Sequence, residues 1–154
     1  MTGGWGWMSD SILGGAGLAG IASGASSAYG ISMATVNVTE ESFARTIAEH
    51  PIVFVDFWAA WCGPCRTFGP VFEKVSVQHP DIVFAKIDTE AEQGLATAAG
   101  ISSIPTLMAI RDGIVVFSQA GALAEPNLAN LVQAVREVDM DTLRASLPGS
   151  RPVT

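Results

Sequence analysis

The sequence predicts a single α/β domain in which a buried strand leads directly into a helix. Residues 52–58 form a short apolar run rich in β-branched and aromatic side chains, as expected of a buried strand. Apolar residues then recur three and four positions apart over 68–75, which is typical of a helix with one buried face. The only two cysteines of the chain, Cys62 and Cys65, fall between these two segments.

Length and composition favour one globular core and exclude several functions. The chain has 154 residues, of which 49% are hydrophobic, and this length suits one core. The net charge of −7, without a basic cluster, argues against a nucleic-acid partner. A zinc site needs about four ligands, and only His50 and His79 could join the two cysteines, so we expect no metal.

Residues 1–33 differ in composition from the rest of the chain. Gly, Ala and Ser dominate, and Asp10 is the only charged residue. Such a leader is too weakly apolar for a core and too glycine-rich for a good helix, so we expect it to be disordered or non-native. The alternatives are a membrane-associated segment over 12–31 and a cleaved signal. The first has few large aliphatic residues, and the second lacks the usual Lys or Arg near its start.

The domain is expected to extend over residues 34–147. The alternating stretch Thr35–Val38 predicts an edge strand. Thr39 is the expected N-cap of a helix over 40–49, because Ser42 follows at the third helical position and two acidic residues occupy the first turn. Two apolar side chains of this helix are expected to be buried, Phe43 and Ile47.

The elements after the cysteines follow from proline, glycine and turn residues. Pro70 should kink the helix that follows Cys65, and Gly100 should end a short alanine-rich helix. Asp112-Gly113 is a strong hairpin signal, and Pro126 suits a helix start. Strands are predicted over 81–88, 107–110 and 114–117, helices near 66–78, 90–99, from 126 onward and over 139–147, and a flexible tail over 148–154.

The cysteine spacing indicates thiol–disulfide chemistry. A thiolate is the reactive form, and a helix N-terminus stabilises it through free N–H groups and the helix dipole. Cys62 is therefore the expected nucleophile, Pro64 fits the first helical turn, and Cys65 is the expected resolving thiol. The alternatives are a structural disulfide, which would close almost no loop and add little stability, and a dithiol without a redox role.

The segment Trp61-Cys62-Gly63-Pro64-Cys65 resembles the active-site motif of thioredoxins. The resemblance covers about Ala34 to Glu137. Four other segments contribute to it in the order found in the family: Phe54–Ala59, Lys86–Asp88, Ile104–Leu107 and Gly121-Ala122.

The resemblance implies the thioredoxin fold, with a central mixed five-stranded sheet in the order 1-3-2-4-5 and helices on both faces. It implies a monomeric, cytoplasmic protein-disulfide reductase with no membrane association and no cofactor of its own. Diverse disulfide-containing proteins would be its targets, and thioredoxin reductase, a flavoprotein that uses NADPH, would recycle it.

The resemblance also implies roles for individual residues. Asp56, a carboxylate in an apolar strand whose pKa should rise, would be the general base for Cys65, and Lys86 would offset its charge. The Ile104–Pro105 bond would be cis, and the backbone of Ile104 would pair with an extended substrate segment. The substrate groove would be formed by Trp61, Gly63, Pro64, Ile104, Pro105, Gly121 and Ala122.

Two other functions are alternatives. A binding or chaperone-like subunit would require neither the two cysteines nor Asp56. An oxidase, or a membrane-tethered or exported protein of the same type, is the second alternative. Oxidising relatives usually carry other residues between the cysteines, so Gly63-Pro64 favours a reductant.

Overall fold

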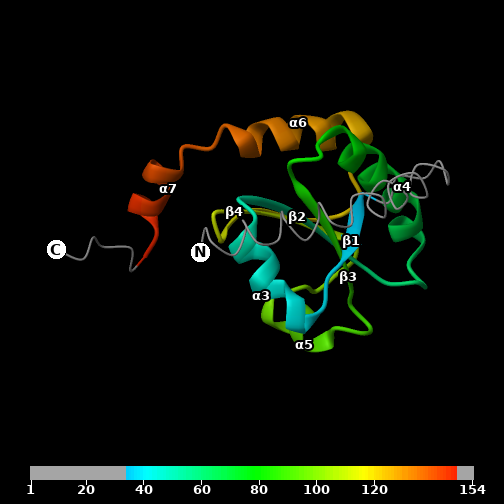
Figure 1. Cartoon of the computed structure of the whole chain (residues 1–154). Coiled ribbons are helices and arrows are strands. Elements are labelled where there is room, and N and C mark those ends of the chain that lie inside the picture. Colours follow the sequence, from blue (N-terminus) through cyan, green and yellow to red (C-terminus); the bar gives the residue numbers. More distant parts are fainter. Residues whose placement is uncertain (1–33, 149–154) are drawn as a thin grey trace, which may run out of the picture. The chain divides into compact units, whose positions relative to one another are not determined.

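A computed structural model describes residues 34–148; the expected leader and residues 149–154 of the expected tail lie outside the described residues. One five-stranded sheet has the strand order β1-β3-β2-β4-β5 (Figure 1). Its strands are β1 (Thr35–Asn37), β2 (Ile52–Trp58), β3 (Val83–Asp88), β4 (Thr106–Arg111) and β5 (Ile114–Ala120). The β1/β3 and β2/β3 pairs are parallel, and the β2/β4 and β4/β5 pairs are antiparallel. The expected mixed sheet and its strand order are confirmed.

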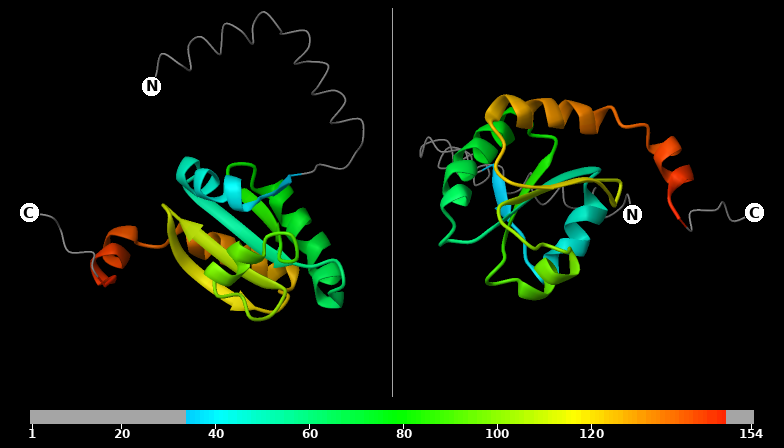
Figure 2. Two further views of the ribbon diagram at one scale, coloured as in Figure 1. Left: turned by 90° about the horizontal axis from the view of Figure 1, so that it is seen from below. Right: turned by 180° about the vertical axis from the view of Figure 1, so that it is seen from behind.

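Helices cover both faces of the sheet. The helices of the described residues are α3 (Glu40–Glu49), α4 (Gly63–Gln78), α5 (Gln93–Ala98), α6 (Glu125–Arg136) and α7 (Met140–Ser146), and the first four cover the sheet. Helices α4 and α6 cover one face, and α3 and α5 cover the other (Figure 2). Between residues 34 and 148, no helix combines the length and the apolar character that crossing a bilayer requires.

Strand β2 lies at the centre of the sheet and supplies both cores. Phe54 points into the core beneath α4 and α6, where its ring stacks on Phe84 with a centroid distance of 5.4 Å. Val55 and Phe57 point into the other core, beneath α3 and α5. Since side chains alternate along a strand, Asp56 lies on the same face as Phe54, beneath α4. The fold therefore places a carboxylate between the sheet and the helix that carries the cysteines.

Several element ends differ from those predicted, and local hydrogen bonds explain two of the differences. The short helix predicted over 90–99 spans only 93–98, because Asp88 Oδ1 accepts the N–H groups of Glu90 and Ala91 and makes a turn there. Strand β3 begins at Val83 rather than residue 81, because the chain turns where the Ile82 N–H donates to the His79 carbonyl. The predicted β5 is also too short, because its pairing with β4 continues to residue 120.

The prediction that α3 buries Phe43 and Ile47 is only partly confirmed, because both side chains pack against the core beneath α3 but neither is fully buried. No residue of this helix is fully buried, and Phe43 and Ile47 are each partly buried. They line a surface pocket of about 390 Å³ together with Met108 and the half-exposed Val115, so α3 covers its edge of the sheet incompletely. The predicted start of α3 is confirmed: Thr39 caps it and forms a reciprocal pair of hydrogen bonds with Ser42.

Candidate active site

The two cysteines occupy the N-terminus of α4. Cys62 is its N-cap, and its Sγ accepts the backbone N–H of Cys65 at 3.2 Å. The two residues are disulfide-bonded, with their Cα atoms 5.2 Å apart, and each is only 4% exposed. A thiolate at Cys62 would keep the N–H donor of Cys65 and the positive end of the helix dipole. Pro64, at the second helical position, loses no intrahelical hydrogen bond there.

Two further segments approach the cysteine pair. The Ile104–Pro105 peptide bond is cis, as expected, and the carbonyl oxygen of Ile104 lies 3.8 Å from Cys62 Sγ. The backbone N–H of Gly121 donates to the Pro105 carbonyl at 2.8 Å. Gly121 has a φ of +106°, which residues with a Cβ rarely adopt. The predicted groove segments around residues 62, 105 and 121 are therefore close together in space.

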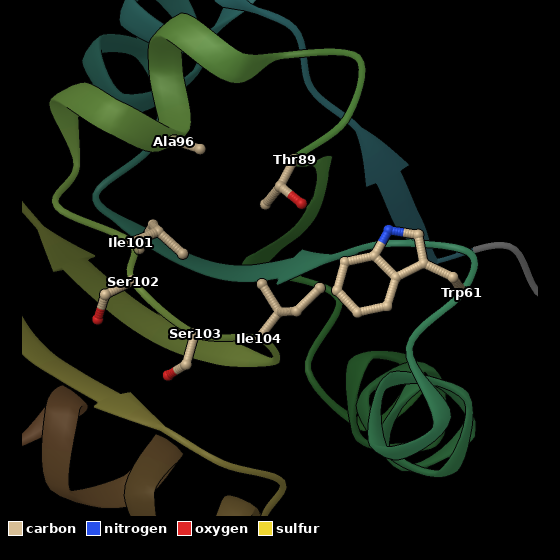
Figure 3. A pocket seen from close by; sticks show the side chains of 7 residues that line it. All are labelled: Trp61, Thr89, Ala96, Ile101, Ser102, Ser103 and Ile104. Carbon is tan, nitrogen blue, oxygen red and sulfur yellow. The ribbon is translucent and has the colours of Figure 1, made fainter.

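A pocket of about 380 Å³ lies beside this junction (Figure 3). Trp61, which is 67% exposed, and Ile104 are the two predicted groove residues that line it. Five lining residues were not predicted as site residues: Thr89, Ala96, Ile101, Ser102 and Ser103. Gly63, Pro64 and Ala122 are exposed but do not line this pocket.

Part of this pocket could have been found from the sequence. Residues 101–103 directly precede the predicted cis-proline segment, so contiguity alone would have included them. Ala96 could not have been predicted, because the sequence of a short alanine-rich helix does not indicate which of its small residues face the pocket. Thr89 lines the pocket because its N–H and hydroxyl both donate to the Trp58 carbonyl, which no sequence pattern indicates.

The Asp56 carboxyl group is fully buried. Burial raises its pKa above the usual value, and the nearby charge and hydrogen bond of Lys86 only partly oppose this effect. Lys86 Nζ lies 3.0 Å from Oδ2 of Asp56, whereas Oδ1 has no hydrogen-bond partner within residues 34–148. One carboxyl oxygen is thus held by the lysine, and the other remains available as a proton acceptor.

The position of Lys86 follows from the strand register. Asp56 in β2 and Lys86 in β3 are directly paired, so their side chains lie on the same face of the sheet. The ammonium also lies 5.4 Å from the Trp58 ring centroid and 5.9 Å from that of Phe72. The Lys86 side chain is 21% exposed, so it connects the solvent-accessible surface to the fully buried carboxyl group of Asp56.

A disulfide at a helix N-terminus, beside a cis-proline and on a helix that covers a buried carboxyl group, is typical of a thiol–disulfide oxidoreductase. The sequence profile of the thioredoxin family matches residues 34–134, and the chain belongs to this family. It is a protein-disulfide reductase whose redox-active pair is Cys62 and Cys65.

Individual relatives give the same result. "Putative thioredoxin 2" of Streptomyces coelicolor is 50% identical over 113 residues, covering 73% of this chain and 84% of that protein. Thioredoxin of Bacillus subtilis is 40% identical over 101 residues, covering 65% of this chain and 96% of that protein. Among solved structures, a thioredoxin variant from Halobacterium salinarum superposes with a TM-score of 0.64 at 32% identity, covering 69% of this chain and 95% of that chain.

Proposed function

We propose that Cys62 is the nucleophile of the reductase and Cys65 its resolving thiol, and that the chain reduces disulfides in many different proteins. The observation that supports this assignment is the hydrogen bond from the Cys65 N–H to Cys62 Sγ at the N-cap of α4. Only Cys62 receives this stabilisation, because the Cys65 sulfur lies one turn inside the helix.

The reaction proceeds in two exchanges. The Cys62 thiolate attacks one sulfur of the target disulfide, which forms a mixed disulfide and releases the first target thiolate. Cys65 then loses its proton and attacks Cys62 Sγ, which forms the Cys62–Cys65 disulfide and releases the second target thiolate. Two electrons pass from the dithiol to the target, and each target thiolate takes up a proton.

Asp56 is the proposed base in the second exchange. It lies beneath the helix that carries Cys65, its pKa is raised by burial, and its Oδ1 is free to take a proton. Lys86, hydrogen-bonded to Oδ2, stabilises the carboxylate form and so keeps Asp56 able to act as a base.

The target is proposed to lie across the junction of the three segments. An extended target chain would pair with the backbone of Ile104, next to Cys62, the cysteine that attacks the target disulfide. An apolar side chain of the target would then enter the pocket between Trp61 and Ala96. The other predicted groove residues would border the same surface: Gly63, Pro64, Pro105, Gly121 and Ala122.

The partners and the compartment follow from this chemistry. Each cycle leaves the protein oxidised, so a second protein must reduce it, and thioredoxin reductase is the proposed partner. A dithiol that must be kept reduced suits the cytoplasm, where disulfides are rare. Residues 34–147 are proposed to be the whole functional domain.

Insulin reduction in the presence of NADPH and a thioredoxin reductase tests the assignment. The native chain should precipitate the insulin B chain and consume NADPH. Cys62→Ser should abolish both, whereas Cys65→Ser should accumulate a mixed disulfide that can be detected by mass spectrometry. Full activity of Cys62→Ser would contradict the proposal and favour a binding function.

A further inference from the structure

Helix α5 has little of its own to hold it in place. It contains six residues, of which only Ala96 is buried, and its N-cap residue Glu92 makes no side-chain bond to its own helix. Helices this short are marginal without outside contacts. Yet α5 forms one wall of the pocket through Ala96, whose carbonyl also accepts the N–H of the lining residue Ile101 at 3.0 Å.

The outside contact comes from the N-terminus of α3. Glu40 Oε2 accepts the backbone N–H of Leu95 at 3.1 Å, and Glu92 Oε1 accepts the backbone N–H of Glu40 at 2.9 Å. Each glutamate therefore caps the helix to which the other belongs, although they lie 52 residues apart in the sequence.

Gly94 leaves the space that this contact needs. A Cβ atom at this position would lie 2.7 Å from Glu40 Oε2 and 3.2 Å from the carboxyl carbon. Any larger residue would have to displace the carboxylate from the N–H of Leu95, the residue just before Ala96 in the pocket wall.

We propose that Glu40 is a positioning residue for target binding: by capping α5, it fixes the wall of the pocket beside Trp61. This inference rests on the proposed function of the pocket. Loss of the cap frees α5 to move, so the pocket binds a protein target less tightly, while the cysteine chemistry at α4 is unaffected. Glu40 contacts neither the cysteines nor the target and acts only through α5.

The test compares Glu40→Ala with Glu41→Ala in the full chain. Glu41 is exposed in the same first turn of α3, so its removal changes the helix charge equally and leaves the cap intact. With NADPH and an excess of thioredoxin reductase to keep the protein reduced, Glu40→Ala should raise the KM for insulin about fivefold, the effect of losing about one hydrogen bond, and leave kcat unchanged. The single-turnover rate of the pre-reduced protein with the small disulfide DTNB should also be unchanged. Glu41→Ala should resemble the native chain.

Two further variants separate positioning from general stability. Glu40→Gln keeps an acceptor for the Leu95 N–H and should restore the native KM, with native amide hydrogen exchange at residues 95 and 96. Gly94→Ala keeps the charge but displaces the carboxylate, and should raise the KM as Glu40→Ala does. An unchanged KM in both Glu40→Ala and Gly94→Ala, or an equal slowing with insulin and DTNB, would overturn the inference; if Glu40→Ala fails to fold, Gly94→Ala decides.

A separate pair of variants tests the pocket itself. Ala96→Leu fills the pocket beside Trp61. Ala98→Leu makes the same change on the face of α5 that borders the separate pocket lined by Phe43 and Ile47. If Ala96→Leu leaves the insulin KM unchanged, the proposed binding role of the pocket is wrong. If it raises the KM while Glu40→Ala does not, only the positioning role of Glu40 is wrong.

Discussion

Lys86 Nζ lies 3.0 Å from Oδ2 of Asp56, a carboxyl group with no solvent-exposed surface. The register of two neighbouring strands pairs these residues directly and places both side chains on the same face of the sheet. Burial nevertheless outweighs the lysine, and the pKa of Asp56 rises. If Asp56 is the base proposed above, this balance between burial and the lysine should affect the second exchange in a way that can be measured.

Asp56→Asn should slow resolution of the mixed disulfide more than its formation. Asparagine keeps the shape but cannot accept the proton of Cys65, so the second exchange loses its base, an effect of about 10²-fold or more for general-base catalysis. Stopped-flow measurement of both exchanges with a disulfide target separates the steps. Equal effects on both, or none, would make Asp56 a structural residue only.

The stability of the same variant provides an independent test. The native pKa of Asp56 is raised above the unfolded value of about 3.9, so the native state binds more protons than the unfolded state between these two values. The stability that protonated Asp56 provides below about pH 4 is therefore lost as the pH rises through the native pKa of this group. Asp56→Asn should be more stable than the native chain at pH 7, by about 1.4 kcal/mol for each pH unit between the two pKa values, and the gain should vanish near pH 4. Urea unfolding at both pH values would measure it.

Lys86→Met should shift the pH dependence of resolution upward. The ammonium lowers the pKa of Asp56, so its removal raises that pKa further and leaves less carboxylate at neutral pH. Loss of a charged hydrogen bond of this kind should slow resolution on the order of tenfold at pH 7, and the rate should recover at higher pH. Lys74→Met is the matched control, because Lys74 is an exposed residue of α4 that pairs with Glu125. An unshifted profile in Lys86→Met would remove the lysine from the mechanism.

Cys62 should react with iodoacetamide at least about tenfold faster than Cys65 in the reduced protein. The reason is the N-cap position of Cys62 and the N–H that Cys65 donates to its sulfur. Mass spectrometry after brief alkylation decides the order, and preferential labelling of Cys65 would reverse the assignment.

The sequence could predict the parts of the site that depend on local pattern. The helix start at Cys62 follows from a strand, a Cys-X-X-Cys pair and a proline within a few residues. The continuous apolar run over 52–58 alone predicts that Asp56 lies in a buried strand. Its pairing with Lys86 needed the register of β2 and β3, which family resemblance supplied and the structure confirms.

Contacts between distant segments could not be predicted in the same way. Two examples are the capping pair between α3 and α5 and the Trp58 carbonyl group that accepts hydrogen bonds from Thr89. Both depend on how the elements pack, which the spacing of apolar residues in the sequence does not indicate. In the sequence, Arg111 lies between the strands predicted over 107–110 and 114–117, which indicates no role beyond the turn. In the structure, its Nη1 donates to the carbonyl oxygens of Val135, Arg136 and Val138, at the end of α6.

Arg111→Met should destabilise the protein by about 2–3 kcal/mol without changing its redox activity. The guanidinium satisfies three carbonyl groups where α6 ends, and its charge also suits that end of the helix dipole. Thermal unfolding should show a lower Tm by roughly 10 °C. Arg45→Met, at an exposed position of α3, is the control and should change the Tm little. A Tm near that of the native chain for Arg111→Met would mean that water replaces the arginine at no cost.

The final prediction concerns residues 1–32, which precede Met33. A chain that begins at Met33 should fold, melt and reduce insulin like the full chain. The family match begins at residue 34, and glycine-rich, nearly uncharged sequence buries too little apolar surface to offset its ordering entropy. Thermal melts and insulin assays of both chains test the prediction, and N-terminal sequencing of the protein from cells shows which start is used. A loss of several degrees on truncation, or recovery of the protein only with membranes, would show that the apolar run over 12–31 has a structural or membrane role.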